Sequence, residues 1–193
     1  MEKLLIITFG DSLTVGFQSP TMNTWYTETP YAGFLSDMLN GKADILVKGI
    51  NGELTEEMVE RFERDVVSLK PHYVTILGGT NDIGWGVNVT KIMQNLFKIY
   101  KTAIDAHIKP VAITVPSLRD YDPLIAPRQL INDLIKKKCH ELDIPVIDLF
   151  RATAEKGTNR LAMQYSNDGL HLSTAGYRLI AELLYNEIFS KIY

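Results

Sequence analysis

Four polar side chains of this sequence could together carry out acyl transfer through a serine nucleophile. Ser12 follows the first apolar run of the chain, and Asn81 follows the third. Asp168 and His171 stand three residues apart, just before the last helical pattern. A histidine can take the proton of a serine hydroxyl, and a carboxylate can orient that histidine. An amide can stabilise the oxyanion that forms. Hydrolysis is therefore the leading functional hypothesis.

Each of these residues also has an ordinary structural explanation. The Gly-Asp-Ser sequence that ends at Ser12 is good turn and cap chemistry. An isolated Asp-x-x-His is more often a helix cap next to a surface histidine. The loop Gly78–Asp82 could be flexible or could cradle a phosphate, but it has no P-loop lysine, and no G-x-G-x-x-G opens the first helix. The occurrence of all the pieces, in order, favours the hydrolase over a nucleotide-binding signalling domain.

Backbone groups could complete such a site. Gly52 follows the second apolar run and offers an N–H that no side chain shields. With the Ser12 N–H and the Asn81 side chain it would give an oxyanion three donors, and losing one donor typically costs ~10²–10³ in rate. If His171 is the base, activity should fall in acid as this histidine becomes protonated.

Strand patterns and helix patterns alternate along the chain. Short apolar runs bounded by Gly, Pro or Asp predict strands buried on both faces: Lys3–Phe9, Ile45–Ile50, His72–Leu77, Pro110–Val115 and Pro145–Leu149. Apolar residues at helical spacing predict the helices between and after them: Pro30–Leu39; Leu54, Met58, Phe62, Val66 and Leu69; Ile92, Leu96, Ile99 and Ala103; Leu130, Leu134 and Lys138; and Tyr177, Ile180, Leu184 and Ile188, with Ser173 as N-cap.

This alternation predicts the fold class and brings the polar residues together. Strands that alternate with helices pair in parallel through right-handed crossovers. We therefore expect an α/β protein, a three-layer α/β/α sandwich with a five-stranded parallel sheet in the flavodoxin-like order 2-1-3-4-5. Ligands of such sheets bind beyond the carboxyl ends of the strands. The loops that carry Ser12, Gly52, Asn81 and the Asp168–His171 pair should all emerge at that edge.

Composition excludes several classes of function. The chain has 193 residues, 46% hydrophobic and 22% charged, as expected for a single globular domain over 1–193. A net charge of −3 gives no case for nucleic acid or an anionic membrane surface. No apolar run approaches the ~20 residues of a membrane span, and no signal peptide is evident, so we expect a cytoplasmic protein without integral membrane association. The sequence carries no signal for an oligomeric state.

The remaining residues capable of chemistry have structural explanations. Cys139 is the only cysteine and is expected to be a packed thiol, because no His/Asn context surrounds it. The other histidines have no partner at metal-ligand spacing, so we predict no metal site: His72, His107 and His140. Several aromatic residues fall in loops, where they could either rim a substrate site or cover the core: Trp25, Tyr26, Trp85 and Tyr121.

These motifs resemble those of the SGNH hydrolases, the GDSL group of esterases and lipases. The resemblance covers essentially the whole chain and rests on four blocks in order: Phe9–Thr14 (FGDSLT), Gly49–Thr55 (GINGELT), Leu77–Asp82 (LGGTND) and Asn167–Leu172 (NDGLHL). It implies an SGNH-hydrolase fold that needs no metal and no organic cofactor. It also implies that Ser12 is the nucleophile, His171 the base and Asp168 its orienter, and that Ser12, Gly52 and Asn81 form the oxyanion hole.

The resemblance leaves the substrate open. The Gly-Gly-Thr-Asn-Asp form of the third block is similar to the acetylhydrolase-like branch, and the chain is short, with few insertions for a lid. We therefore expect a small-molecule substrate with a short acyl group, such as an acetylated carbohydrate. A lysophospholipase or an acyl thioesterase of the same family is the alternative. A more distant alternative is a non-catalytic glycan- or lipid-binding module, which would not need a base beside a serine.

Overall fold

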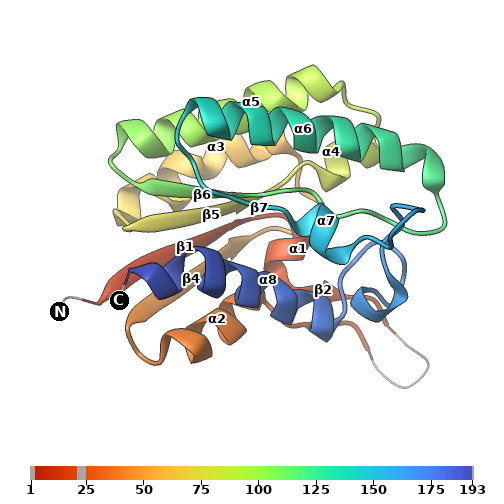
Figure 1. Cartoon of the computed structure of the whole chain (residues 1–193). Coiled ribbons are helices and arrows are strands. Elements are labelled where there is room, and N and C mark those ends of the chain that lie inside the picture. Colours follow the sequence, from red (N-terminus) through yellow and green to blue (C-terminus); the bar gives the residue numbers. More distant parts are fainter. Residues whose placement is uncertain (1–2, 21–24, 193) are drawn as a thin grey trace.

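The computed structural model describes residues 3–20 and 25–192 of the chain (Figure 1). Strands and helices alternate along most of it, as the sequence pattern predicts. The elements in chain order are β1 (Leu4–Gly10), α1 (Ser12–Val15), β2 (Phe17–Gln18), β3 (Thr27–Glu28), α2 (Tyr31–Leu39), β4 (Ala43–Gly49), α3 (Thr55–Asp65), β5 (Tyr73–Leu77), α4 (Thr80–Gly84), α5 (Val89–Asp105), β6 (Lys109–Ile113), α6 (Ile125–Glu141), β7 (Val146–Ile147), α7 (Leu149–Thr153) and α8 (Thr174–Glu187).

Five strands form one parallel sheet in the order β4-β1-β5-β6-β7. Numbered by their place in the sequence, these strands have the predicted order 2-1-3-4-5. Helices α3, α5 and α6 cover one face of the sheet, and α2 and α8 cover the other (Figure 1). The predicted three-layer α/β/α sandwich is therefore confirmed.

The alternation of side chains along β1 divides its residues between two cores. Ile7 and Phe9 are fully buried under α3, α5 and α6, whereas Ile6 is fully buried on the α2 and α8 side. Successive side chains of a strand point to opposite faces, so a strand between two helical layers must be apolar at consecutive positions. Burial of β1 between two helical layers therefore explains the continuous apolar run at the start of the chain.

Strand β4 corrects one prediction, because it is not buried on both faces. It covers Ala43–Gly49 rather than Ile45–Ile50, and it is an edge strand that pairs only with β1. Leu46 and Val47 are 39% and 40% exposed. An apolar run shows that a strand forms, but not how many neighbours the strand has.

Helix α6 corrects a second prediction, because its buried face is shifted by one residue. Leu130 is 53% exposed, and the core contains Ile131 and Ile135 instead. Asn132 shares the buried face, where its side chain accepts a hydrogen bond from the Val115 N–H and donates one to the Val115 carbonyl, each 2.8 Å long. A buried polar residue that is satisfied by backbone groups interrupts the apolar pattern and hides the true face.

Three local boundaries also differ from the sequence pattern. The helix expected to continue through Leu69 ends at Asp65 and is followed by a 3₁₀ turn over Val67–Leu69. The last strand is only Val146–Ile147, because the Asp148 side chain accepts the Arg151 N–H and starts α7. Strands β2 and β3 pair as a small antiparallel hairpin that the sequence does not reveal, since two residues per strand carry no periodicity.

Candidate active site

Ser12 is the first residue of α1 and follows the interior strand β1, from which it is separated only by Asp11. The Asp11 carboxylate caps this helix by accepting the Leu13 N–H at 2.9 Å. Gly10 is required for the turn, because a Cβ there would lie 2.0 Å from the Leu77 carbonyl oxygen. Ser12 is 5% exposed, and no described residue accepts a hydrogen bond from its backbone N–H. The turn therefore presents both the hydroxyl and a free N–H at the carboxyl edge of the sheet.

Asp168 and His171 form the predicted pair. The Asp168 Oδ2 lies 2.8 Å from His171 Nδ1, and these two side chains are 24% and 20% exposed. The other oxygen, Oδ1, accepts the backbone N–H groups of Leu170 and His171, and the Ser19 hydroxyl donates to Oδ2. Burial acts to raise the pKa of Asp168, but these hydrogen bonds outweigh it and hold the pKa well below its usual range. The carboxylate is therefore ionised beside the imidazole.

The small hairpin supports the His171 ring from its other side. The ring centroid of Phe17, in β2, lies 4.6 Å from that of His171. The Tyr177 hydroxyl of α8 donates to the Phe17 carbonyl at 2.7 Å, which fixes the hairpin to the body of the protein. The sequence did not indicate this role for Phe17, because a lone aromatic residue before a loop carries no specific signal.

The two further oxyanion candidates lie in neighbouring segments: Gly52 is in the loop after β4, and Asn81 is in the first turn of α4, where the sequence pattern predicts a loop. The Asn81 side-chain amide donates to the Glu53 carbonyl at 2.9 Å, which leaves its second N–H available. Gly52 has φ of +77°, a left-handed conformation that favours glycine, and no described residue accepts its N–H. The hydrogen bond between Asn81 and Glu53 thus joins the first turn of α4 to the loop after β4, where the two donors lie.

Asp11 connects these loops electrostatically. The pKa of Asp11 is raised to about 7, mainly by burial and to a smaller extent by the Asp82 charge. The Leu13 N–H and a charged His171 act in the opposite direction. Asp82 in turn accepts the Thr55 N–H and hydroxyl at the start of α3. The charges that act on Asp11 come from Asp82 in α4, from His171 and from Arg128 in α6, so Asp11 interacts with two of the segments that carry predicted site residues.

One expected contact does not form. Among the described residues, no hydrogen bond joins the Ser12 hydroxyl to His171. In ligand-free enzymes such bonds are often long and shorten only when substrate is bound. The structure therefore pairs His171 with Asp168, and it shows no direct bond between this pair and Ser12.

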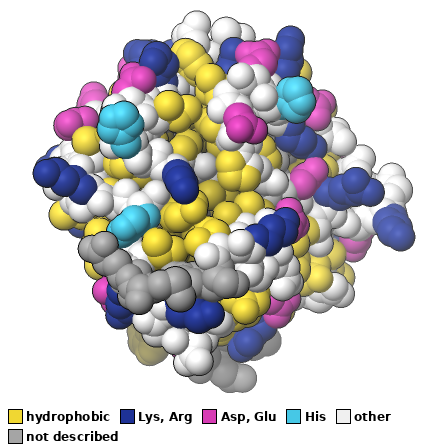
Figure 2. Space-filling view, turned by 60° about the vertical axis from the view of Figure 1, so that its left-hand side comes forward, with side chains coloured by type: hydrophobic (Ala, Val, Ile, Leu, Met, Phe, Trp, Pro, Cys, Tyr) yellow, Lys and Arg dark blue, Asp and Glu magenta, His cyan; other side chains and the backbone are white. Residues whose placement is uncertain are grey.

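A pocket of about 360 Å³ adjoins these residues, and both Asn81 and Asp168 line it. Its rim contains Trp85 and Tyr121, which are 80% and 58% exposed. A larger hollow of about 620 Å³ lies at the amino ends of β5 and β6, and Figure 2 shows hydrophobic side chains gathered on that side of the molecule. The larger hollow is at the opposite edge of the sheet from Ser12, so of these two pockets the smaller one is on the side of the candidate site.

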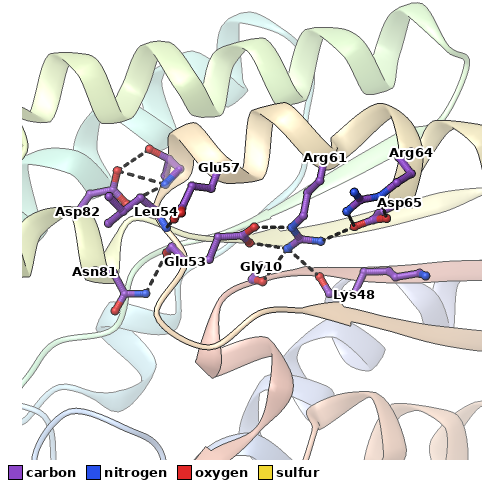
Figure 3. Close-up of polar contacts among 11 residues, drawn as sticks. Gly10, Lys48, Glu53, Leu54, Glu57, Arg61, Arg64, Asp65, Asn81 and Asp82 are labelled. Carbon is purple, nitrogen blue, oxygen red and sulfur yellow. Dashed lines mark hydrogen bonds and ion pairs between the residues drawn. The ribbon is translucent and has the colours of Figure 1, made fainter.

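The sequence analysis missed a buried ion pair beside these loops. Arg61 of α3 binds the carboxylate of Glu53, the residue after Gly52, and neither side chain is more than 6% exposed (Figure 3). A signal was present, because Arg61 lies on the buried face of α3 between Met58 and Phe62. A charged residue at a core position needs a buried partner.

His72 and Cys139 have structural roles, whereas His107 and His140 are exposed at the surface. His72 Nδ1 accepts the Leu5 N–H at 2.9 Å. Cys139 is fully buried, and burial raises the pKa of its thiol to about 12, so the expectation of a packed thiol is confirmed. Over 3–20 and 25–192, no cluster of three His, Cys, Asp or Glu side chains is placed to hold a metal ion. No helix in the same ranges is both long and apolar enough to cross a membrane.

Known proteins resemble this chain along nearly its whole length. It is 23% identical over 209 residues to an acetylxylan esterase of Geobacillus stearothermophilus, which spans 97% of this chain and 94% of that protein. It is 26% identical over 215 residues to the uncharacterized lipoprotein YqeF of Bacillus subtilis, over 92% of this chain and 86% of that one. The crystal structure of the lipase/acylhydrolase from Enterococcus faecalis superimposes with a TM-score of 0.82 at 24% identity, over 97% and 96% of the two chains. The model of the GDSL-like lipase/acylhydrolase family matches residues 8–179. The chain therefore belongs to the GDSL-like lipase/acylhydrolase family.

Proposed function

We propose that this protein is a serine esterase that hydrolyses carboxylic esters through an acyl-enzyme. The observation that carries the proposal is the ionised Asp168 bound to His171 Nδ1, at the same sheet edge as Ser12. A carboxylate bound to Nδ1 directs the lone pair of Nε2 outward, where it can accept a proton. A binding protein has no need of this arrangement.

The reaction proceeds in two steps. His171 Nε2 takes the proton of the Ser12 hydroxyl while Oγ forms a bond to the ester carbonyl carbon. The imidazolium, stabilised by Asp168, then returns the proton to the departing alkoxide, and the alcohol leaves an acyl-serine. In the second step His171 activates a water molecule, which releases the acid and restores the Ser12 hydroxyl.

The oxyanion of each tetrahedral intermediate would be held by the Ser12 N–H, the Gly52 N–H and the Asn81 side chain. The two backbone donors have no acceptor among the described residues, and Asn81 keeps one N–H uncommitted. Donors that are fixed before the reaction begins stabilise the developing charge without reorganisation. Their free hydrogen-bonding capacity supports this role.

The substrate class follows from the pocket and the relatives. A volume of about 360 Å³ is near the lower end of ligand pockets, which favours a short acyl group over a long chain. Exposed Trp85 and Tyr121 rings offer flat apolar faces to a sugar. An acetylxylan esterase is among the relatives. We therefore assign acetyl esters of carbohydrates as substrates, with long-acyl esters and thioesters as the alternative.

The test is hydrolysis of p-nitrophenyl esters from acetate to decanoate, with Ser12→Ala in parallel. We expect turnover that declines with chain length and is absent in Ser12→Ala, followed by release of acetate from acetylated xylo-oligosaccharides. A maximum at decanoate would favour the long-acyl alternative. A folded protein with no turnover, whose Ser12 also resists an organophosphonate, would favour a non-catalytic binding module.

Two further expectations are part of the proposal. The chain is one hydrolase domain over 1–193, and it acts in the cytoplasm. The alternative to the second expectation is attachment to a membrane, because the relative YqeF is a lipoprotein. Fractionation of the producing cell, with immunodetection of the native protein in cytoplasmic and membrane fractions, decides between the two locations.

A further inference from the structure

We propose that Arg61 and Glu53 form a buried clamp that positions the oxyanion donors of the esterase. The inference rests on the proposed function, because the clamp acts through Gly52 and Asn81 rather than on substrate. Both are positioning residues. Neither lines the pocket beside the site.

The ion pair is bidentate and almost wholly buried. Arg61 Nε and Nη2 donate to the two carboxylate oxygens of Glu53, and the two side chains are 6% and 4% exposed (Figure 3). The guanidinium also lies over the Phe9 ring, 4.1 Å from its centroid. A planar guanidinium bound in this way has one permitted orientation, so it can act as a rigid connector.

The same guanidinium binds the two strands that precede the site. Its Nη2 donates to the carbonyls of Gly10 and Lys48, both at 3.1 Å. Gly10 ends β1 two residues before Ser12, and Lys48 lies in β4 four residues before Gly52. Arg61 thereby fixes the backbone from which two of the three donors project.

Glu53 carries the constraint to the third donor. It directly follows Gly52, and its carbonyl oxygen accepts the Asn81 side-chain amide at 2.9 Å (Figure 3). A shift of Glu53 would therefore move the Gly52 N–H and the Asn81 side chain together. The Arg61 side chain of α3 thus helps to fix the positions of all three donors, which belong to Ser12, Gly52 and Asn81.

Stability alone does not account for such a pair. Burying two charges is costly, and apolar residues of similar volume are often as stable as a buried ion pair. Oxyanion donors, in contrast, lose much of their effect when displaced by a fraction of an ångström, because catalysis depends on their alignment before the reaction. Arg61 offers one rigid group with enough donors to hold three separate segments.

The decisive variant removes both charges together. Glu53→Gln with Arg61→Met keeps the approximate volume and leaves no buried charge unpaired, so the fold should survive. We expect an unchanged KM for p-nitrophenyl acetate and a kcat about 10- to 100-fold lower, less than the ~10²–10³ lost when a donor is deleted outright. Arg61→Met alone should lose both kcat and thermal stability, because it leaves Glu53 buried and unpaired.

Comparison of stability with activity distinguishes positioning from a purely structural role. If the double variant regains the melting temperature of the wild type and also its kcat, the clamp is only structural and the proposal is wrong. A low kcat at normal melting temperature supports positioning. In an Asn81→Ala background the same double change should cost less than in the wild type, because one of the donors it positions is already gone.

Asp65→Asn is the matched control. Asp65 binds Arg61 Nη1 at 3.1 Å on the side away from the site, so its loss should leave kcat within about two-fold of the wild type. Wild-type protein without esterase activity would overturn the proposed function itself. An active wild type with a fully active double variant would overturn the clamp alone, so the two failures are distinguishable.

Discussion

Asp168 holds His171 at two points, one on the backbone and one on the ring. Its Oδ1 accepts the His171 backbone N–H at 2.7 Å, while its Oδ2 lies 2.8 Å from Nδ1 of the same residue. Gly169, with φ of +81°, allows the tight turn between them. The carboxylate therefore sets both the tautomer and the direction of the imidazole, and the three-residue spacing is what permits both contacts.

Replacing Asp168 by Asn should keep the turn and remove most of the activity. The Asn Oδ1 can still accept the His171 backbone N–H, but its amide would donate to Nδ1 and stabilise the wrong tautomer. We expect kcat to fall on the order of 10⁴-fold, as when the triad Asp is replaced in serine proteases. Steady-state kinetics with p-nitrophenyl acetate measure the change. Asp133→Asn, at an exposed position of α6, is the control and should have normal kcat.

The acid limb of the pH profile should belong to His171 rather than to Asp168. Asp168 stays ionised because its hydrogen bonds hold its pKa well below the usual range. Activity should therefore fall with acid, as expected for a histidine base that gains a proton. Asp11 also titrates near neutral pH and interacts with His171, so the test uses Asp11→Asn, in which the fall should be a single one-proton step. A two-proton slope in kcat/KM of Asp11→Asn would show that a further group titrates and would contradict this assignment.

Asn81→Ala should lower kcat with little change in KM. Its uncommitted N–H would contact the oxyanion in the transition state and not the ground state, so we expect a loss of about 10²–10³. Asn88→Ala is a matched control, because Asn88 caps α5 by accepting the Thr90 N–H and lies outside the site. It should lower the melting temperature, at a cost of about 1 kcal/mol, and leave kcat unchanged. If Asn81→Ala kept its kcat and only lost thermal stability, the role of Asn81 as an oxyanion donor would be refuted.

The sheet and the candidate site could be predicted from sequence because both depend on short local patterns. Buried parallel strands are continuous apolar runs, and their carboxyl ends share one edge, so the sequence predicts the parallel sheet and leads us to expect Ser12, Asn81 and His171 at that edge. The exposure of β4 was not predicted, although the expected order 2-1-3-4-5 places this strand at an edge of the sheet, because its apolar run resembles that of a strand buried on both faces.

Contacts between buried polar groups were the other feature that local patterns did not reveal. Arg61 binds Glu53 and two backbone carbonyls, and Asn132 binds the backbone at Val115. In both cases a polar residue occupies a core position of a helix, and its partner lies in another segment. The sequence shows the misplaced polar residue, but only the structure supplies the partner.

Asp11 should make the protein less stable as the pH rises from acid to neutral. Burial raises its pKa from 3.8 to about 7, so between these values the folded protein keeps a proton that the unfolded chain has lost. The free energy of unfolding therefore declines over this window and is constant above it. Asp11→Asn, which can still accept the Leu13 N–H, should remove this decline. Its melting temperature relative to the wild type should be higher at pH 8 than at pH 5, and Asp133→Asn should show no such trend.

Trp85→Ala should separate carbohydrate esters from simple esters. The Trp85 side chain is 80% exposed at the rim of the pocket, so its removal should not affect the melting temperature. If its face binds a sugar ring, KM for acetylated xylo-oligosaccharides should rise about ten-fold, whereas p-nitrophenyl acetate, which has no sugar, should be hydrolysed as before. Leu130→Ala, an exposed apolar residue of α6, controls for loss of surface hydrophobicity. An equal rise in KM for both substrates would mean that Trp85 supports the site as a whole and does not bind a sugar. That result would remove the main structural argument for a carbohydrate substrate.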